Sequence, residues 1–313
     1  MNDLKYIAIV GVGRSGTTLL MSMLNAHPLI AFPPEFHFIN QHLAKRPNAK
    51  FKEAFLRLKN DHRFRRLNID LNDVMRPLRS KKTINLSTLY REILRCYAQR
   101  ENVQIIGDKA PKNIEYLPVI RKIFPDAVII HLIRDPRDVY LSRINAQWSS
   151  NRPDILQFLA YRAQYEMGRS FGNKLFGDNY IEIFYEDLIT EPEKELHKIC
   201  SLVGVRYTEK MLQFSQSAQK LVADDEMKWK KEVLGPLIAT NMKKWMKKLN
   251  KKQIENIETA CNTAFKDRLY QKSYPDNSIK KSIGNFGMAV LSSVYKANIL
   301  VKNWKVNCMI NTN

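Results

Sequence analysis

The chain lacks the features that assign a protein to several familiar classes. Its four cysteines lie far apart in 313 residues, and no pair has the CxxC spacing of a redox or zinc site. No histidine cluster completes a metal site, so we expect no metal. The N-terminus has no apolar signal core, and no run reaches the ~18 uninterrupted apolar residues of a membrane-spanning helix. We therefore expect a soluble, cytoplasmic protein with reduced thiols.

Acidic residues are scarce as well. Asp and Glu number 31 against 51 Lys and Arg, which gives a formal net charge of +20. Such a surface attracts an anionic partner: nucleic acid, a membrane face, or a ligand that carries phosphate or sulfate. Hydrophobic residues make up 44 %, which supports a packed core and excludes a disordered chain.

Short apolar runs alternate with helical patterns along most of the chain. The patterns predict strands at 5–10, 103–106, 127–133 and 180–184, and helices at 17–26, 113–123, 135–147 and from about residue 186. The run at 127–133 is almost continuously apolar, as in a strand that is buried on both faces of a parallel sheet. The alternation predicts an α/β fold, with a P-loop-like central parallel sheet flanked by helices.

Two segments depart from this alternation in their charge. Residues 45–100 are helical in pattern and contain 16 Lys and Arg against 5 Asp and Glu, and residues 228–252 contain nine lysines and one glutamate. The segment 45–100 is predicted to be a basic helical insertion in a domain that spans residues 1–275.

The composition changes again at residue 276, where a basic tail of residues 276–313 begins. Four of its apolar residues fit one stripe of a helix: Val290, Leu291, Val294 and Val301. Two interpretations remain open, a helix docked on the domain and an anchor at an anionic membrane surface.

The first motif, GVGRSGTT at residues 11–18, lies between a predicted strand and a predicted helix. Backbone amides of such a turn, together with the helix N-terminus, form an anion site. The motif fits GxGxxG, with Glu35 about 20 residues later, and also GxxxxGK[ST], with Thr17 at the lysine position. The dinucleotide template is weakened because only a short apolar run precedes Pro33. The missing lysine suits a ligand without a γ-phosphate.

The second motif, IIHLIRDPRDVYLS at residues 129–142, is a buried strand followed by the start of a helix. Arg134 stands at the carboxyl end of the strand, where open α/β sheets bind ligands. Ser142 follows two helical turns later, on the same side. Two separate anion sites imply a ligand that is phosphorylated at two distant places.

Together the two motifs resemble the sulfotransferases that use 3′-phosphoadenosine 5′-phosphosulfate (PAPS), over roughly residues 5 to 270. Within that family the run RSGTTLLMSMLNAHP, followed by Glu35, is most similar to the tyrosylprotein, bacterial and carbohydrate branches. The resemblance implies that the first loop holds the phosphosulfate through Arg14, Ser15, Gly16, Thr17 and Thr18. It implies that Arg134 and Ser142 hold the 3′-phosphate.

The resemblance also assigns the remaining site residues. Glu35 matches a general base, Lys109 matches a lysine near the transferred group, and Tyr185 matches a tyrosine near the adenine. Arg14 and Lys109 would stabilise the charge that develops on the bridging oxygen. His37 is a competing base, two residues from Glu35. The lysine-rich loop at 228–231 resembles a segment that closes over the cofactor, but its contacts, within residues 221–245, cannot be assigned from sequence.

Three classes of function remain as alternatives to transfer onto a glycan or glycolipid hydroxyl. These are a protein-tyrosine sulfotransferase, a P-loop nucleotide kinase and a non-enzymatic nucleic-acid-binding protein. The last rests on charge alone and leaves both motifs unexplained. Because residues 45–100 supply +11 of the formal charge, we expect an anionic acceptor or membrane contact rather than specific nucleic acid. The sequence does not predict an oligomeric state.

Overall fold

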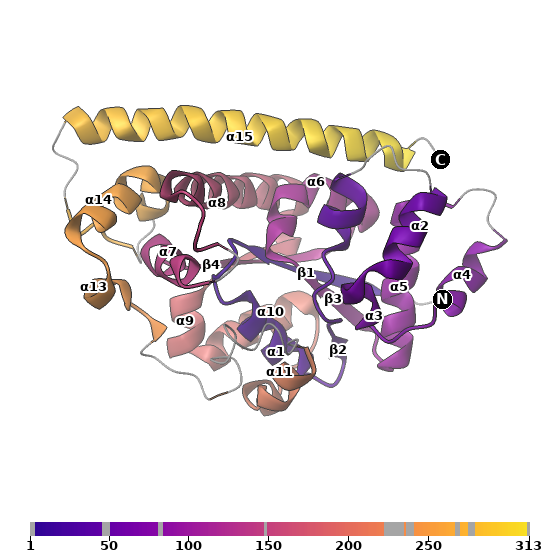
Figure 1. The fold of residues 1–313 in the computed structure, drawn as a ribbon. Helices are drawn as coiled ribbons and strands as arrows, with labels where there is room; N and C mark the ends of the chain where they lie inside the picture. Colours follow the sequence, from indigo (N-terminus) through magenta and orange to yellow (C-terminus); the bar gives the residue numbers. More distant parts are fainter. Residues whose placement is uncertain are drawn as a thin grey trace.

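The computed structural model describes residues 4–45, 51–80, 84–146, 149–221, 235, 241–266, 270–274 and 279–311. The lysine-rich loop at 228–231 lies outside the described residues. Five parallel strands form one sheet in the order β2-β3-β1-β4-β5 (Figure 1). The strands are β1 (Lys5–Gly11), β2 (Ile30–Ala31), β3 (Ile105–Lys109), β4 (Val128–Ile133) and β5 (Tyr180–Phe184). The predicted α/β fold with a central parallel sheet is confirmed.

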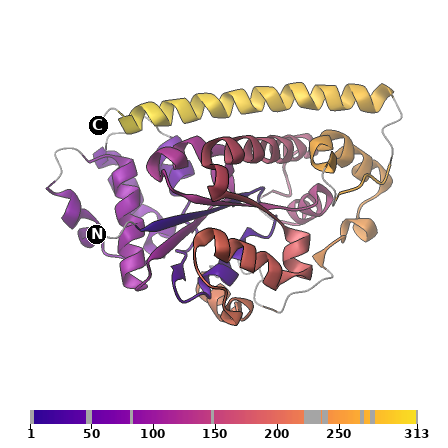
Figure 2. The same ribbon diagram turned by 180° about the vertical axis from the view of Figure 1, so that it is seen from behind.

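Helices cover both faces of the sheet (Figures 1 and 2). One face carries α1 (Thr17–Asn25), α9 (Tyr185–Thr190), α10 (Pro192–Val203) and α11 (Ser215–Leu221). The other carries α5 (Leu86–Arg100), α6 (Leu117–Ile123) and α8 (Asp154–Phe176). Residues of β1 alternate between the two sides, because successive side chains of a strand point to opposite faces. Ile7 and Ile9 pack into the core around α1, whereas Tyr6, Ala8 and Val10 pack into the core around α5 and α6.

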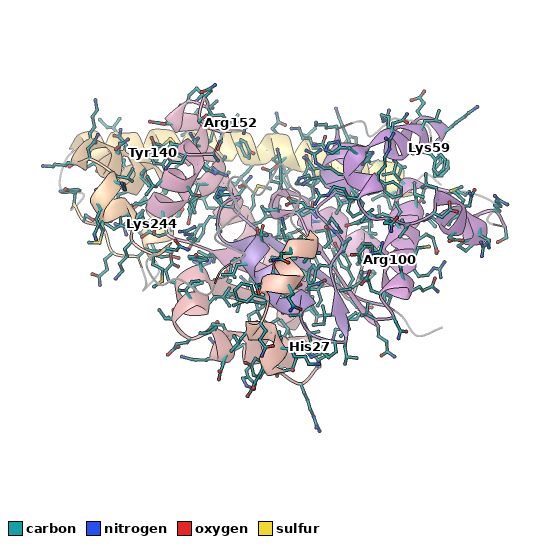
Figure 3. The ribbon with its side chains drawn as sticks, turned by 60° about the horizontal axis from the view of Figure 1, so that its bottom comes forward. His27, Lys59, Arg100, Tyr140, Arg152 and Lys244 are labelled. Carbon is teal, nitrogen blue, oxygen red and sulfur yellow. The ribbon has the colours of Figure 1, made fainter. Side chains whose placement is uncertain are left out.

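Short helices lie between β2 and α5, most of them within the basic segment 45–100. They are the π-helix η1 (Ile39–Ala44), α2 (Phe51–Asn60), α3 (His62–Arg65), α4 (Leu71–Met75) and the 3₁₀ helix η2 (Arg76–Leu78). Figure 3 shows Lys59 of α2 and Arg100 of α5 at one end of the molecule, with Arg152 and Lys244 at the other. These two cations of the basic segment 45–100 therefore lie at the same end of the fold.

The remaining helices lie around α8. They are α7 (Pro136–Ile144), α13 (Trp245–Lys248), α14 (Lys251–Ala260) and α15 (Ile279–Asn311). α15 lies along one side of the molecule and contacts α6, α8 and α14 (Figures 1 and 2). Short 3₁₀ helices complete the described elements: η3 (Pro111–Tyr116), η4 (Gly177–Asn179), η5 (Glu209–Leu212) and η9 (Asn262–Lys266). No described helix has the length and apolarity that crossing a bilayer requires.

Three predicted elements differ from the structure in their boundaries. The helix predicted at 135–147 ends earlier, since α7 spans Pro136–Ile144. The strand predicted at 103–106 lies at Ile105–Lys109, because the ladder with β1 continues through the pairs Ala8–Asp108 and Ile9–Lys109. The helix predicted at 113–123 is divided into η3 and α6. Pro118, in the first turn of α6, has no N–H to continue a hydrogen-bonded helix from η3.

The strand order places a topological switch point between β1 and β4. The chain leaves β1 toward β2 and leaves β4 toward β5, on the opposite side of the sheet. Ligands of open α/β sheets bind in the crevice at such a point, outside the carboxyl ends of the strands. Both sequence motifs lie at this switch point. The first motif follows β1, and Arg134 of the second motif follows β4.

Candidate functional site

The loop after β1 has the backbone geometry of an anion-binding turn. Gly16 caps the N-terminus of α1 in the left-handed region, with φ of 93°, and Arg14 also has a positive φ of 83°. The first amides of α1 have no partner within the helix and point toward a ligand position. A Cβ at Gly16 would stand 2.4 Å from the Tyr185 ring, so only glycine lets the loop pack here.

Ser15 carries an observation that points to a ligand. Its side chain is fully buried, and its Oγ has no hydrogen-bond partner among the described residues. A buried hydroxyl without a partner costs about 1–3 kcal/mol, so such groups are rare in folded proteins. An oxyanion held by the neighbouring amides would satisfy this hydroxyl.

Arg134 extends from the end of β4 under the same loop. Its Nη1 donates to the carbonyl oxygen of Arg14 at 3.2 Å, and its Nη2 donates to the carbonyl oxygen of Asn241 at 2.7 Å. The guanidinium carbon lies 4.3 Å from the centroid of the Tyr185 ring. The Nε of Arg134 is buried without a hydrogen-bond partner in the part of the chain that the structure describes. One donor of this arginine thus remains for a ligand.

Arg14 and Ser142 meet across the crevice. The Nε of Arg14 donates to the Oγ of Ser142 at 2.9 Å, which joins the loop after β1 to the last turn of α7. The structure therefore brings together five predicted site residues: Arg14, Ser15, Arg134, Ser142 and Tyr185. The first and the last of these lie 171 residues apart in the sequence. Thr17 and Thr18 begin α1 beside them and are buried.

A second cluster contains the acid and lysine predicted for the chemistry. Lys109, the last residue of β3, is 1 % exposed, and its Nζ donates to Oε2 of Glu35. The other oxygen, Oε1, lies 3.2 Å from Nε2 of His37. Lys109 pairs in register with Ile9, two residues before the anion-binding loop begins at Gly11. The ion pair therefore lies at the same edge of the sheet as the loop.

Glu35 is not an exposed residue at the start of a helix. It belongs to a non-helical segment between β2 and η1, and it is 9 % exposed. Two aromatic side chains that follow Glu35 anchor this segment, because Phe36 and Phe38 are buried in the core and Phe38 stacks on Tyr90 at 4.6 Å between ring centroids. The carboxylate is thereby held in one place over Lys109.

Asp108 adds a second buried carboxyl group beside this pair. Its Oδ2 accepts hydrogen bonds from the hydroxyl of Tyr90 at 2.6 Å and from Nδ2 of Asn113 at 3.0 Å. Burial raises the pKa of Asp108 to about 6, and the nearby Glu35 carboxylate acts in the same direction. Asp108 was not singled out from the sequence, because the direction of its side chain depends on the register of β3.

The raised pKa of Asp108 predicts a pH-dependent effect on stability. The folded state binds the proton more tightly than the unfolded chain, so the contribution of Asp108 to stability falls as pH rises from about 4 to about 6. Asp108→Asn removes this dependence. The difference in unfolding free energy, variant minus wild type, should therefore increase by about 2 kcal/mol between pH 4 and pH 7. Urea unfolding at several pH values measures it.

The matched control is Asp178→Asn, which changes an exposed carboxylate. A constant offset of the Asp108→Asn variant, from lost or altered hydrogen bonds, leaves the prediction intact, because only the change with pH is at issue. Parallel pH profiles for wild type and Asp108→Asn would contradict it.

Sequence reasoning missed two further contacts of the site. Arg143, next to Ser142 on α7, is buried, and its Nε donates to the carbonyl oxygen of Gly13 at 3.3 Å. Burial lowers the pKa of Arg143 to about 10. Asn241 holds Arg134 through its backbone oxygen.

Among the described residues, no group of three or more His, Cys, Asp or Glu side chains is placed to hold a metal ion.

The chain matches the family described as "Sulfotransferase family" over residues 7–209. Among curated proteins, the chain is 25 % identical to protein-tyrosine sulfotransferase A of Caenorhabditis elegans over 221 residues, which covers 67 % of this chain and 53 % of that protein. It is 27 % identical over 132 residues to an omega-hydroxy-beta-dihydromenaquinone-9 sulfotransferase of Mycobacterium tuberculosis, covering 38 % of this chain and 33 % of that protein.

Among solved structures, the chain is similar to the sulfotransferase domain of the Synechococcus PCC 7002 olefin synthase. The TM-score is 0.55 at 22 % identity, and the match covers 82 % of this chain and 93 % of that one. This likeness concerns the fold. The matched region spans about half the length, 53 %, of the tyrosine sulfotransferase named above.

Proposed function

The chain belongs to the sulfotransferase family, and we propose that it moves a sulfuryl group from PAPS to an acceptor hydroxyl by in-line displacement. PAPS supplies a sulfuryl group bonded to a phosphate that can leave. The observation that carries the proposal is the buried Glu35–Lys109 pair at the end of β3, at the same sheet edge as the anion-binding loop. A proton acceptor and a cation are the two groups that this transfer needs.

The residues of the crevice fit a donor with two separated anionic groups. Ser15 and the amides of the loop from Arg14 to Thr18 would hold the phosphosulfate, and the unpartnered Ser15 Oγ supports this assignment. Arg134 and Ser142 would hold the 3′-phosphate, for which the Nε of Arg134 is available. Tyr185, which stacks on Arg134, would lie near the adenine.

Glu35 would take the proton of the acceptor hydroxyl. In the structure its two oxygens contact Lys109 and His37, so the carboxyl group is held in one orientation. His37 is 24 % exposed at its side chain and lies on the solvent side of Glu35, whereas Lys109 lies on the buried side. Lys109 and Arg14 would stabilise the negative charge that moves onto the leaving oxygen.

We propose a glycan or glycolipid hydroxyl as the acceptor. A cavity of about 590 Å³ opens among α2, α3 and α4 in the basic segment. Its lining combines apolar side chains with three cations and one acid: Phe55, Phe64 and Ile69 with Lys59, Arg65, Arg79 and Asp70. Such a lining suits an acceptor that carries both an apolar part and an anionic group. A peptide tyrosine is the second candidate, favoured by the likeness to the Caenorhabditis elegans enzyme.

A transfer assay tests both the reaction and the acceptor. Purified protein is incubated with PAPS labelled in the sulfate, together with a glycolipid extract or a tyrosine-containing peptide, and the labelled product is identified. We expect label in the glycolipid fraction. Label in the peptide alone would favour the second candidate. Failure to bind adenosine 3′,5′-bisphosphate, the desulfated donor, would contradict the sulfotransferase proposal as a whole.

A further inference from the structure

The longest helix, α15, has an apolar surface on both sides. Its inward side packs on the body of the protein: Met288, Ile299 and Val306 are buried, and Met288 and Val306 belong to two different core clusters. Tyr295 donates to Glu115 at 2.7 Å, and Lys296 donates to Glu166 at 2.7 Å. These contacts fix which side of the helix faces solvent.

The opposite side carries a row of exposed apolar residues, here called the outer stripe. They recur at helical spacing over six turns and point away from the body. The outer stripe consists of Ile283, Phe286, Val290, Val294, Val301 and Trp304. Phe286 is 73 % exposed and Trp304 is 65 % exposed, so these two large aromatic side chains are largely uncovered by the described residues. A long apolar surface of this kind marks an interaction site on a soluble protein.

The charge of α15 indicates what the outer stripe contacts. The 33 residues of the helix contain five lysines and no Asp or Glu. The exposed side chains of Lys302 and Lys305 lie beside Trp304 at the C-terminal end of the stripe. A second copy of this helix would bring lysines against lysines without a single acid to pair with them. An anionic lipid bilayer offers negative charge to the lysines and an apolar interior to the side chains of the outer stripe.

We propose that the outer stripe of α15 docks the protein on an anionic lipid bilayer. The helix would lie in the plane of the interface, because its inward side remains packed on α6, α8 and α14. Phe286 and Trp304 would enter the boundary between headgroups and acyl chains, where aromatic side chains are favoured, and the exposed lysines would contact lipid phosphates. Docking needs no rearrangement of the body. It goes beyond the proposed sulfuryl transfer and does not depend on it.

Vesicle flotation with the full chain tests the proposal. The probes are phosphatidylcholine vesicles with and without phosphatidylglycerol. We expect the wild type to float with the vesicles that contain phosphatidylglycerol, and added salt should weaken this binding. Phe286→Ser combined with Trp304→Ser should weaken it about tenfold or more, because two large apolar side chains no longer enter the lipid. Lys302→Gln combined with Lys305→Gln should reduce the preference for phosphatidylglycerol.

The matched control combines Leu29→Ser with Met246→Ser, two exposed apolar positions outside α15. It should bind vesicles like the wild type, and thermal unfolding confirms that each variant is folded. Wild-type protein that stays out of every vesicle fraction would overturn the proposal, as would equal binding by the Phe286/Trp304 variant. Concentration-dependent dimerisation that the same variant abolishes would assign the outer stripe to self-association instead. None of these readouts needs donor or acceptor, so they are independent of the transfer assay.

Discussion

Glu35→Gln should lower the rate of sulfuryl transfer by about 100-fold or more, because the variant cannot accept the proton of the acceptor hydroxyl. Affinity for adenosine 3′,5′-bisphosphate should change little, since the substitution leaves Arg134, Ser142 and the amides of the loop in place. Steady-state turnover with labelled PAPS measures the first effect, and calorimetric titration with the bisphosphate measures the second.

Two further variants test whether the expected loss of turnover comes from the loss of the general base. Glu92→Gln, which breaks the Arg95 ion pair on α5, removes a carboxylate away from the site and should leave turnover unchanged. His37→Ala tests the competing base. If His37→Ala abolishes turnover while Glu35→Gln retains it, His37 is the base. Because Glu35→Gln leaves the buried Lys109 without a carboxylate, thermal unfolding is recorded for each variant, and Glu35→Asp serves as a variant that keeps the charge.

Arg134→Ala should reduce the affinity for adenosine 3′,5′-bisphosphate by about 10- to 100-fold, the effect of losing hydrogen bonds to a charged group. Its guanidinium stands at the carboxyl end of β4 and keeps one buried donor without a partner among the described residues. Calorimetric titration with the bisphosphate measures the change. Arg134→Lys should recover part of the loss at most, because an ammonium group has no planar fork of donors.

Comparison with a second nucleotide distinguishes a direct contact between Arg134 and the 3′-phosphate from an indirect effect on the loop. Arg134 also supports the loop through the carbonyl oxygen of Arg14, so its removal could disturb binding indirectly. Adenosine 5′-phosphate lacks the 3′-phosphate, and its affinity should be nearly the same for wild type and Arg134→Ala. Equal losses for both nucleotides would show that Arg134 acts through the loop rather than on the 3′-phosphate.

The sheet could be predicted from sequence where apolar runs are continuous. β5 lies at Tyr180–Phe184 as expected, and β4 lies at Val128–Ile133 within the predicted run. β3 was misplaced because its second half, Gly107–Lys109, is polar and glycine-containing. Those residues are held in the strand by pairing with β1, and pairing between segments about 100 residues apart leaves no local pattern.

The site could be predicted where side chains belong to a local motif. The loop and Arg134 follow from their neighbours, but the burial of Glu35 does not. The aromatic residues Phe36 and Phe38 on either side of His37 were a signal that this segment enters the core. The support of Arg134 by Asn241 could not be found in the sequence, because the contact uses a backbone oxygen that any residue would supply.

Arg14 makes two contacts whose combination has a further consequence. Its side chain bonds Ser142 on α7, and its carbonyl oxygen bonds Arg134 after β4. The loop and the end of β4 are therefore tied at a set separation before any ligand arrives, and preorganisation of this kind costs no ordering entropy on binding. For the proposed donor, the fixed distance between the two anion sites selects for a matching distance between the two phosphates. A nucleotide with the same charge but a different spacing between its phosphates could bind at one site only. The crevice would therefore distinguish nucleotides by the spacing of their phosphates rather than by their charge.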